Sequence, residues 1–305
     1  MRRNKTYIAA AHILLLLLIV VILIPGEKKT QSPGAFIGAV LVMETLYLLK
    51  LLQNRKHEQS ATVPSCIISI LWIFLLLWDT AVTKLNLMHP VLYPAPENVF
   101  YVFVSQYGEI LMHVLSTLEL LLISIAIGVT AGVLAGAFTG WNRALSGVLY
   151  PIANVLAPIP SIIYAPYIIS LMPSFRSASA VVIALGIFFP MFLNMVNRVQ
   201  SMDQEIIDSA RMLNVSGRSM VTKIILPYLI PGVISGMKVT LTTSFMLLMF
   251  AEMMGATRGL GYFIVNYNTY GNYTNVIAGI IVIGVLVSVL NALVTLLQKK
   301  AIRWR

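Results

Sequence analysis

Long apolar stretches recur along the 305-residue chain and are separated by short polar segments. A helix that crosses the hydrocarbon core of a bilayer needs about 20 mostly apolar residues. Eight stretches meet this length, at residues 7–25, 35–53, 64–85, 109–138, 147–172, 177–197, 228–252 and 275–297. The pattern therefore predicts an all-α fold, a polytopic transmembrane bundle of about eight helices.

Two of these stretches depart from a simple straight span. Residues 109–138 exceed the required length, so we expect that helix to bend or end early. Residues 147–172 contain Pro151, Pro158, Pro160 and Pro166. A proline inside a helix removes a hydrogen bond and kinks it, and broken backbone at membrane depth is tolerated where protein or water satisfies it. The second stretch is thus a candidate for lining a pathway, at Pro158 and Pro160; a kinked packing helix is the alternative.

Glycines recur every four residues along and just beyond the 109–138 stretch, at Gly128, Gly132, Gly136 and Gly140. This spacing places them on one helix face, where small residues let a second helix approach closely. We interpret them as packing positions.

The composition supports a membrane protein. Hydrophobic residues make up 58% of the chain and charged residues 10%, against about 25% charged in an ordinary soluble domain. These values exclude a soluble enzyme and a disordered chain, and a single cysteine, Cys66, excludes a disulfide scaffold.

The net charge of +10 raises the question whether the chain binds nucleic acid, and the distribution of the basic residues along the chain answers it. With the N-terminus inside, only Lys28, Lys29, Lys84, Arg176 and Arg258 fall on the outer side, out of 21 basic residues. Such a bias predicts cytoplasmic N- and C-termini by the positive-inside rule. It also argues against a nucleic-acid partner, because the charges lie in short flanking loops and form no continuous patch.

The clearest polar break along the chain is residues 54–63. We therefore expect an extra N-terminal two-helix transmembrane hairpin, 1–63, followed by a six-helix core, 64–305.

The loop between the sixth and seventh stretches, residues 201–227, is amphipathic. Ser201 can cap a first short helix whose apolar stripe is Ile206, Ile207, Ala210 and Leu213. Asn214 suits a left-handed turn, and Ser216 can cap a second short helix that ends before Pro227. The pattern predicts a helix–turn–helix outside the bilayer, either resting on the headgroups or docking a soluble cytoplasmic partner.

This loop resembles the EAA loop of ABC-importer permeases, whose pattern is EAA-x3-G-x9-I-x-L-P. Asp208-Ser209-Ala210 stands at the EAA position, Asn214 at the glycine position, and Ile224 and Leu226-Pro227 at the end, all at the family spacing. Asp for Glu keeps the charge, Ser for Ala keeps the size, and Asn for Gly keeps access to the left-handed turn.

The wider span of residues 64–305 resembles the nitrate/sulfonate/taurine branch of these permeases. The resemblance rests on Pro158-Ile159-Pro160, on Phe189-Pro190 and on the run from Ala251 to Tyr262. Glu119 differs, because the family usually has a basic residue at that position.

The resemblance implies a type I ABC-importer permease core with cytoplasmic coupling helices, in the bacterial cytoplasmic membrane. It implies a second permease copy in a homodimer, cytoplasmic ABC ATPase subunits, an extracytoplasmic solute-binding protein, and a small solute such as a sulfonate, taurine, nitrate or a vitamin-precursor-like molecule. The residues that it assigns to ATPase coupling are Glu205, Asp208, Ser209, Ala210, Arg211, Asn214, Ser216, Gly217, Leu226 and Pro227. The chain has no G-x4-G-K-[ST] phosphate loop, so we expect it to bind no cofactor, with ATP-Mg held by the partner ATPase.

Acidic residues inside predicted spans are functional candidates because a charge there needs a partner or water. They are Glu44, Glu119 and Glu252. Glu44 can face either His12 or the water on the outer side. We predict a pathway or gate at Glu252 with the glycine-rich residues that follow it, Gly255, Gly259, Gly261 and Tyr262. A structural hydrogen bond from the amide of Gly255 or Gly259 to Glu252 is the alternative.

Two other classes of function compete with an importer. A secondary transporter or channel not powered by ATP would normally show acids spread through several spans and matching broken helices. A membrane enzyme would need paired ligands or a nucleophile motif, and the four histidines are scattered. We predict no catalytic residue and no metal site.

Overall fold

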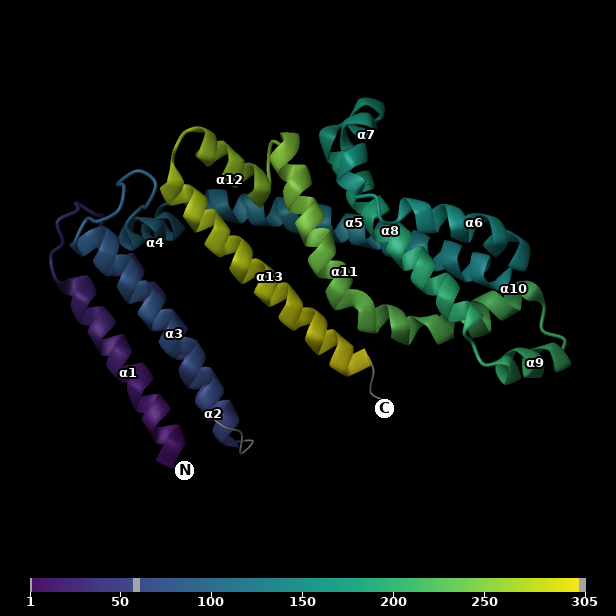
Figure 1. Cartoon of the computed structure of the whole chain (residues 1–305), viewed down its shortest axis with the longest axis horizontal. Coiled ribbons are helices and arrows are strands. Elements are labelled where there is room, and N and C mark those ends of the chain that lie inside the picture. Colours follow the sequence, from purple (N-terminus) through teal and green to yellow (C-terminus); the bar gives the residue numbers. More distant parts are fainter. Residues whose placement is uncertain (1, 57–60, 302–305) are drawn as a thin grey trace. The chain divides into compact units, whose positions relative to one another are not determined.

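The structure of the chain, a computed structural model, describes residues 2–56 and 61–301. Helices and their connecting loops make up the whole of this described part, as Figure 1 shows, and it contains no β-strand. The all-α prediction is confirmed.

Seven helical segments among the described residues are long and apolar enough to cross a membrane. They are α1 (Arg2–Leu23), α2 (Gly34–Lys56), α3 (Thr62–Asp79) with the π turn Thr80–Lys84, α5 (Tyr107–Trp141), α8 (Phe175–Gln200), α11 (Leu226–Gly255) with the segment before it, and α13 (Tyr273–Ala301). The predicted span at 147–172 is broken. Its two parts, α6 (Arg143–Leu156) and Ser161–Leu171, the latter including α7 (Ala165–Leu171), meet at 86°.

Prolines account for the 86° bend. Pro158 and Pro160 lie in the non-helical elbow between the two parts, both exposed, and Pro160 directly precedes the short 3-10 turn Ser161–Tyr164. The predicted kink is confirmed. If the bent pair counts as one span, the number of spans reaches the predicted eight.

Helix α5 corrects one expectation, because it continues unbroken for 35 residues. It contains no proline, and its four spaced glycines lie against α8. A Cβ added to Gly128, Gly132, Gly136 or Gly140 would lie 2.6 to 2.8 Å from the Cβ of the α8 residue that it faces. Close packing along the whole glycine face supports a helix longer than a bilayer requires.

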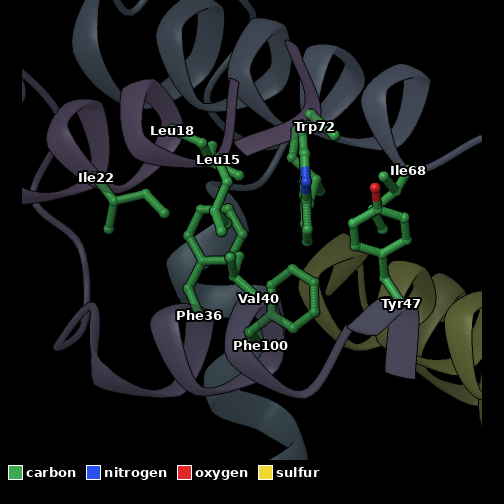
Figure 2. Close-up of a cluster of buried hydrophobic side chains, with 11 residues drawn as sticks. Leu15, Leu18, Ile22, Phe36, Val40, Tyr47, Ile68, Trp72 and Phe100 are labelled. Atoms are coloured by element: carbon green, nitrogen blue, oxygen red, sulfur yellow. The ribbon is translucent and has the colours of Figure 1, made fainter. Parts of the chain in front are cut away.

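The chain forms two compact units, and the first contains Met1–Ile110 and Ile264–Ile281. Its core lies between α1, α2, α3 and α4 (Pro96–Ser105), where Leu18, Phe36, Trp72 and Phe100 are buried. Figure 2 shows these side chains gathered in one cluster. The rings of Phe36 and Phe100 stack with centroids 5.0 Å apart.

A buried charge cluster also joins the N-terminal hairpin to α3 and α4. Lys84 Nζ lies 3.7 Å from Asp79 Oδ2 and 3.9 Å from Glu97 Oε1. It donates hydrogen bonds to the carbonyl oxygens of Ile22, in the last turn of α1, and Ile24, just beyond that helix. Burial raises the pKa of Glu97 above its usual value. Packing thus unites the hairpin with α3 and α4, and the division at residue 63 stays a prediction of the sequence pattern.

In the predicted hairpin, His12 Nδ1 lies 3.1 Å from Glu44 Oε1. Of the two alternatives for Glu44, the one with His12 is therefore present, and it gives the carboxylate of α2 a partner on α1.

The second unit contains Leu111–Phe263 and Val282–Arg305. It holds both candidate sites. One apolar cluster packs α5, α8 and α11 around Leu121, Ile183 and Leu248, and another joins the ends of α5 and α8 to the segment that precedes α11.

Candidate functional site

The predicted helix–turn–helix forms, with a different start. Helix α9 is Gln204–Met212, whereas Ser201 belongs to the end of α8, where its hydroxyl donates to Arg198 O at 3.2 Å. The expected cap at Ser201 is therefore wrong, because α8 continues to Gln200 and its last turn takes up that hydroxyl. Ile206 N donates instead to Asp203 O at 3.1 Å.

The turn after α9 follows the sequence pattern. Asn214 has φ of 52°, in the left-handed region, and Val215 N donates to Ala210 O at 3.2 Å. Ser216 then caps the next helical segment, α10 (Gly217–Ser219), by accepting a hydrogen bond from Ser219 N. The role of asparagine here is conformational, since few residues with a side chain tolerate this backbone region.

The second helix does not end before Pro227, which corrects the expectation from sequence. The π turn Met220–Ile225 follows α10 and runs directly into α11, so the helical segment is continuous from Gly217 to Gly255. Leu226 N donates to Val221 O, five residues back. This wider turn accommodates Pro227, which has no N–H and lies in the first turn of α11.

We call residues 204–227 the coupling segment, after the role predicted for its residues. One side of this segment, its underside, is buried against α5 and α8. Ala210, Met220, Val221 and Ile225 are all buried there, in one cluster with side chains at the ends of α5 and α8. The segment is thus seated firmly on the helices that precede it.

The opposite side of the coupling segment is exposed. Met212 is 86% exposed and Leu213 78% exposed, and we call this pair the apolar tip. Leu213, expected in the buried stripe, lies outside it because the chain reverses direction immediately afterwards. Ile206 is also exposed, so only Ala210 and the half-buried Ile207 follow the predicted stripe.

The other predicted coupling residues are distributed along the coupling segment. Exposed positions are Glu205, Asp208, Ser209, Asn214, Ser216, Gly217 and Pro227, while Leu226 is half-buried. Gln204 Nε2 donates to Asp208 Oδ1 at 3.2 Å, which holds that carboxylate along α9. The side chain of Arg211 lies outside the described part of the chain.

The second candidate site is the glycine-rich block, residues 251–262, at the other end of α11. Glu252 is 2% exposed. Its carboxylate accepts a hydrogen bond from Thr117 Oγ1 at 2.8 Å and another from Gly261 N at 2.8 Å. Leu260 N donates to the same Thr117 hydroxyl at 2.8 Å. Helix α12 (Leu260–Thr269) therefore begins with two amides held by α5 and α11.

His113 completes this network one turn away along α5. Its Nδ1 accepts a hydrogen bond from Gly259 N at 3.0 Å, and its ring lies 5.4 Å from that of Phe263 and 5.8 Å from that of Tyr262. The amide that contacts Glu252 is thus that of Gly261. The structural alternative proposed from sequence had the right kind of bond and the wrong glycine.

Two glycines of the block are required by the carboxylate. Gly259 has φ of 118°, and a Cβ there would lie 2.3 Å from the carboxyl group of Glu252. A Cβ on Gly261 would lie 2.7 Å from Glu252 Cβ. A Cβ on Gly255 would instead lie 3.0 Å from the ring of Phe175. These contacts give Glu252 a structural function; the gate stays a prediction.

Sequence reasoning missed Thr117 and the part played by His113. Both are four residues apart on α5 and so share a helix face, but their partners lie more than 130 positions away. The elbow prolines Pro158 and Pro160 lie outside the glycine-rich block.

A cavity of about 360 Å³ between α8 and α11 was not predicted from the sequence either. Its lining includes Asn194, Gly232, Gly236, Thr240 and Thr243.

With this arrangement established, comparison with known proteins gives the class. Residues 128–303 match the family described as the inner-membrane component of binding-protein-dependent transport systems. This match covers more than half of the chain, and the chain belongs to that family. The predicted ABC-importer permease is confirmed, against a secondary transporter or channel.

Particular relatives agree with the branch expected from sequence. The taurine transport system permease protein TauC of Escherichia coli (strain K12) is 26% identical over 273 residues, which cover 87% of this chain and 98% of TauC. The nitrate import permease protein NrtB of Leptolyngbya laminosa is 28% identical over 172 residues, 56% of this chain and 62% of NrtB.

Among solved structures, an inward-facing MetNI methionine ABC transporter has a chain of similar fold. The TM-score is 0.50 at 22% sequence identity, and the likeness covers 65% of this chain and 94% of that one. The predicted importer-permease fold is thereby confirmed.

Proposed function

We propose that this chain is the subunit that forms the translocation path of an ATP-driven importer for a small anionic solute. In this proposal the coupling segment docks on a cytoplasmic ATPase subunit, and the permease alternates between inward- and outward-facing states. A solute-binding protein delivers the solute from outside, and two copies of the permease enclose the path.

The observation that carries this proposal is the two-sided character of the coupling segment. Its underside is buried against the ends of α5 and α8, whereas Met212 and Leu213 at its apolar tip are 86% and 78% exposed. Two adjacent large apolar side chains, fixed in position and rimmed by polar residues, are typical of a surface that a protein partner covers. A groove on an ATPase would bury them.

The helical continuity from Gly217 to Gly255 supports a mechanical role for this segment. Figure 1 shows the ribbon running from α10 into α11 without interruption. A displacement of the coupling segment is therefore transmitted along one helix to Glu252 and the glycine-rich block. Because the sequence carries no phosphate loop, the proposal places ATP and Mg²⁺ on the partner subunit.

The charge distribution supports an orientation in which the coupling segment and both termini are cytoplasmic. Arg198 at the end of α8, Arg218 and Lys223 in the coupling segment, and Lys299 and Lys300 at the end of α13 would then lie on the same side. This is the side on which ATP is available.

The solute class rests on the relatives. TauC is named for taurine and NrtB for nitrate, and both of these solutes carry an oxyanion group. We infer a small oxyanion for this chain as well, of the sulfonate or nitrate kind.

A single substitution tests the docking surface. Leu213→Glu places a charge on the apolar tip, and we expect it to abolish capture of a co-expressed ABC ATPase subunit while membrane insertion is unchanged. Tyr270→Glu is the matched control, because Tyr270 is also 78% exposed and lies in the loop between α12 and α13. Retained capture by Leu213→Glu, or equal loss in both variants, would contradict the assignment.

A further inference from the structure

A small pocket at the glycine-rich end of α11 has the chemistry of an anion site. It has a volume of about 100 Å³ and lies where α5, the first turns of α8 and residues 255–258 meet. Its polar lining consists of Ser116, Arg176, Ser179, Thr257 and Arg258. This volume equals that of roughly three water molecules in the liquid, at ~30 Å³ each, so it suits a compact head group.

The two arginines of the pocket differ in their partners. Arg176 Nη2 lies 2.5 Å from Glu119 Oε2, in an ion pair that is about half exposed on both sides. Arg258 forms no ion pair or hydrogen bond with any residue in the described part of the chain. The pocket therefore carries one uncompensated positive charge, and a second that Glu119 compensates.

Hydroxyl groups supply further donors. Ser179 is only 3% exposed, and its hydroxyl makes no hydrogen bond within the described residues. Ser116 and Thr257 add two more hydroxyls to the lining. Each of these hydroxyls can donate a hydrogen bond to an oxyanion bound in the pocket.

The pocket is also held in shape by the network described above. Arg258 directly precedes Gly259, whose amide is bonded to His113, and Leu260, whose amide is bonded to Thr117. On the other side, α8 begins next to Arg176 with a capping box formed by Ser174 and Ser177, and the positive end of a helix dipole favours an anion. A fixed frame reduces the ordering cost of binding.

We propose that this pocket binds the oxyanion group of the solute at the mouth of the translocation path, with Arg258 as its principal cation and Ser179 as a hydroxyl donor. The proposal rests on the function proposed above and adds a site within the permease itself. Glu119 opposes binding by occupying Arg176, so the anion and Glu119 compete for the same guanidinium group.

The test uses trifluoromethanesulfonate, a sulfonate with a fluorine signal, titrated against the full chain in lipid nanodiscs and followed by line broadening in fluorine NMR. We expect saturable broadening with the natural chain. Arg258→Gln should weaken the apparent affinity about tenfold, because a hydrogen bond to a charged group is lost. Arg143→Gln is the control; Arg143 is exposed at the start of α6 and lies outside the pocket.

A second variant should change the apparent affinity for the sulfonate in the opposite direction. Glu119→Gln frees Arg176 and should strengthen binding about twofold to fivefold, the range of an exposed ion pair. An Arg258→Gln titration equal to that of the natural chain, an equal loss in Arg143→Gln, or weaker binding in Glu119→Gln would overturn the proposal.

The two proposals can fail separately. If the natural chain captures its ATPase and yet causes no broadening, the pocket proposal fails and the importer assignment stands. If it binds the sulfonate and captures no ATPase, the importer assignment is the one that fails.

Discussion

The two ends of the helical segment Gly217–Gly255 differ in the exposure of their polar and apolar groups. At the coupling segment, polar side chains and the apolar tip are exposed, and the turn is closed by local bonds such as that from Val215 N to Ala210 O. At the glycine-rich block, Thr117 of α5 donates to the buried Glu252 carboxylate, and α5 also accepts hydrogen bonds from the amides of Gly259 and Leu260. The amide of Gly261 donates to Glu252 itself. The first end presents exposed side chains, as the proposed docking on an ATPase requires, and the second is a fixed frame.

The largest expected effect is at Gly259. Gly259→Ala combines a positive φ with a Cβ that would overlap the Glu252 carboxyl group, so we expect a loss of about 3 kcal/mol in the free energy of unfolding. Thermal unfolding in detergent measures it. Gly271→Ala is the control, since Gly271 has φ of 66° in open space and should cost only about 1 kcal/mol. Equal losses would show that the carboxylate does not confine the loop.

An intermediate effect is expected at Thr117. Thr117→Val keeps the shape of the side chain but removes one donor to Glu252 and the acceptor for Leu260 N. The buried groups left unpaired should reduce the free energy of unfolding by about 2 kcal/mol. Thr139→Val, at a buried threonine on the same helix whose side chain makes no hydrogen bond among the described residues, should change stability far less. A neutral Thr117→Val would contradict the idea of a fixed frame.

The smallest effect is expected at the coupling segment. Ser216→Ala removes the cap on Ser219 N, which is typically worth about 1 kcal/mol. Amide hydrogen exchange over residues 217–225 should accelerate while thermal unfolding of the whole chain barely changes. Ser209→Ala, exposed on α9 without a cap bond, serves as the control. A global loss of stability from Ser216→Ala would remove the contrast between the two ends.

Sequence reasoning located what depends on local pattern. Apolar length gave the spans, the proline spacing gave the elbow at Pro158 and Pro160, and Asn214 with Ser216 gave the turn and cap of the coupling segment. Each of these features is determined within a few residues of itself.

The features that it missed depend on contacts distant in sequence. Ser201 and Ser216 are equally good caps by type, and only the length of α8 shows that Ser201 is already used. Thr117 is one polar residue on an apolar helix until α11 brings Glu252 beside it. The unbroken length of α5 likewise depends on α8, because its glycine face is filled by side chains of that helix.

The glycine face of α5 also constrains how the permease can move. At four successive turns there is no room for even a methyl group between α5 and α8, so sliding or rotating one helix against the other would require all four contacts to break together. These two helices must travel as one rigid body during transport. Movement within this unit is therefore expected elsewhere, at breaks in helical structure such as the elbow between α6 and α7.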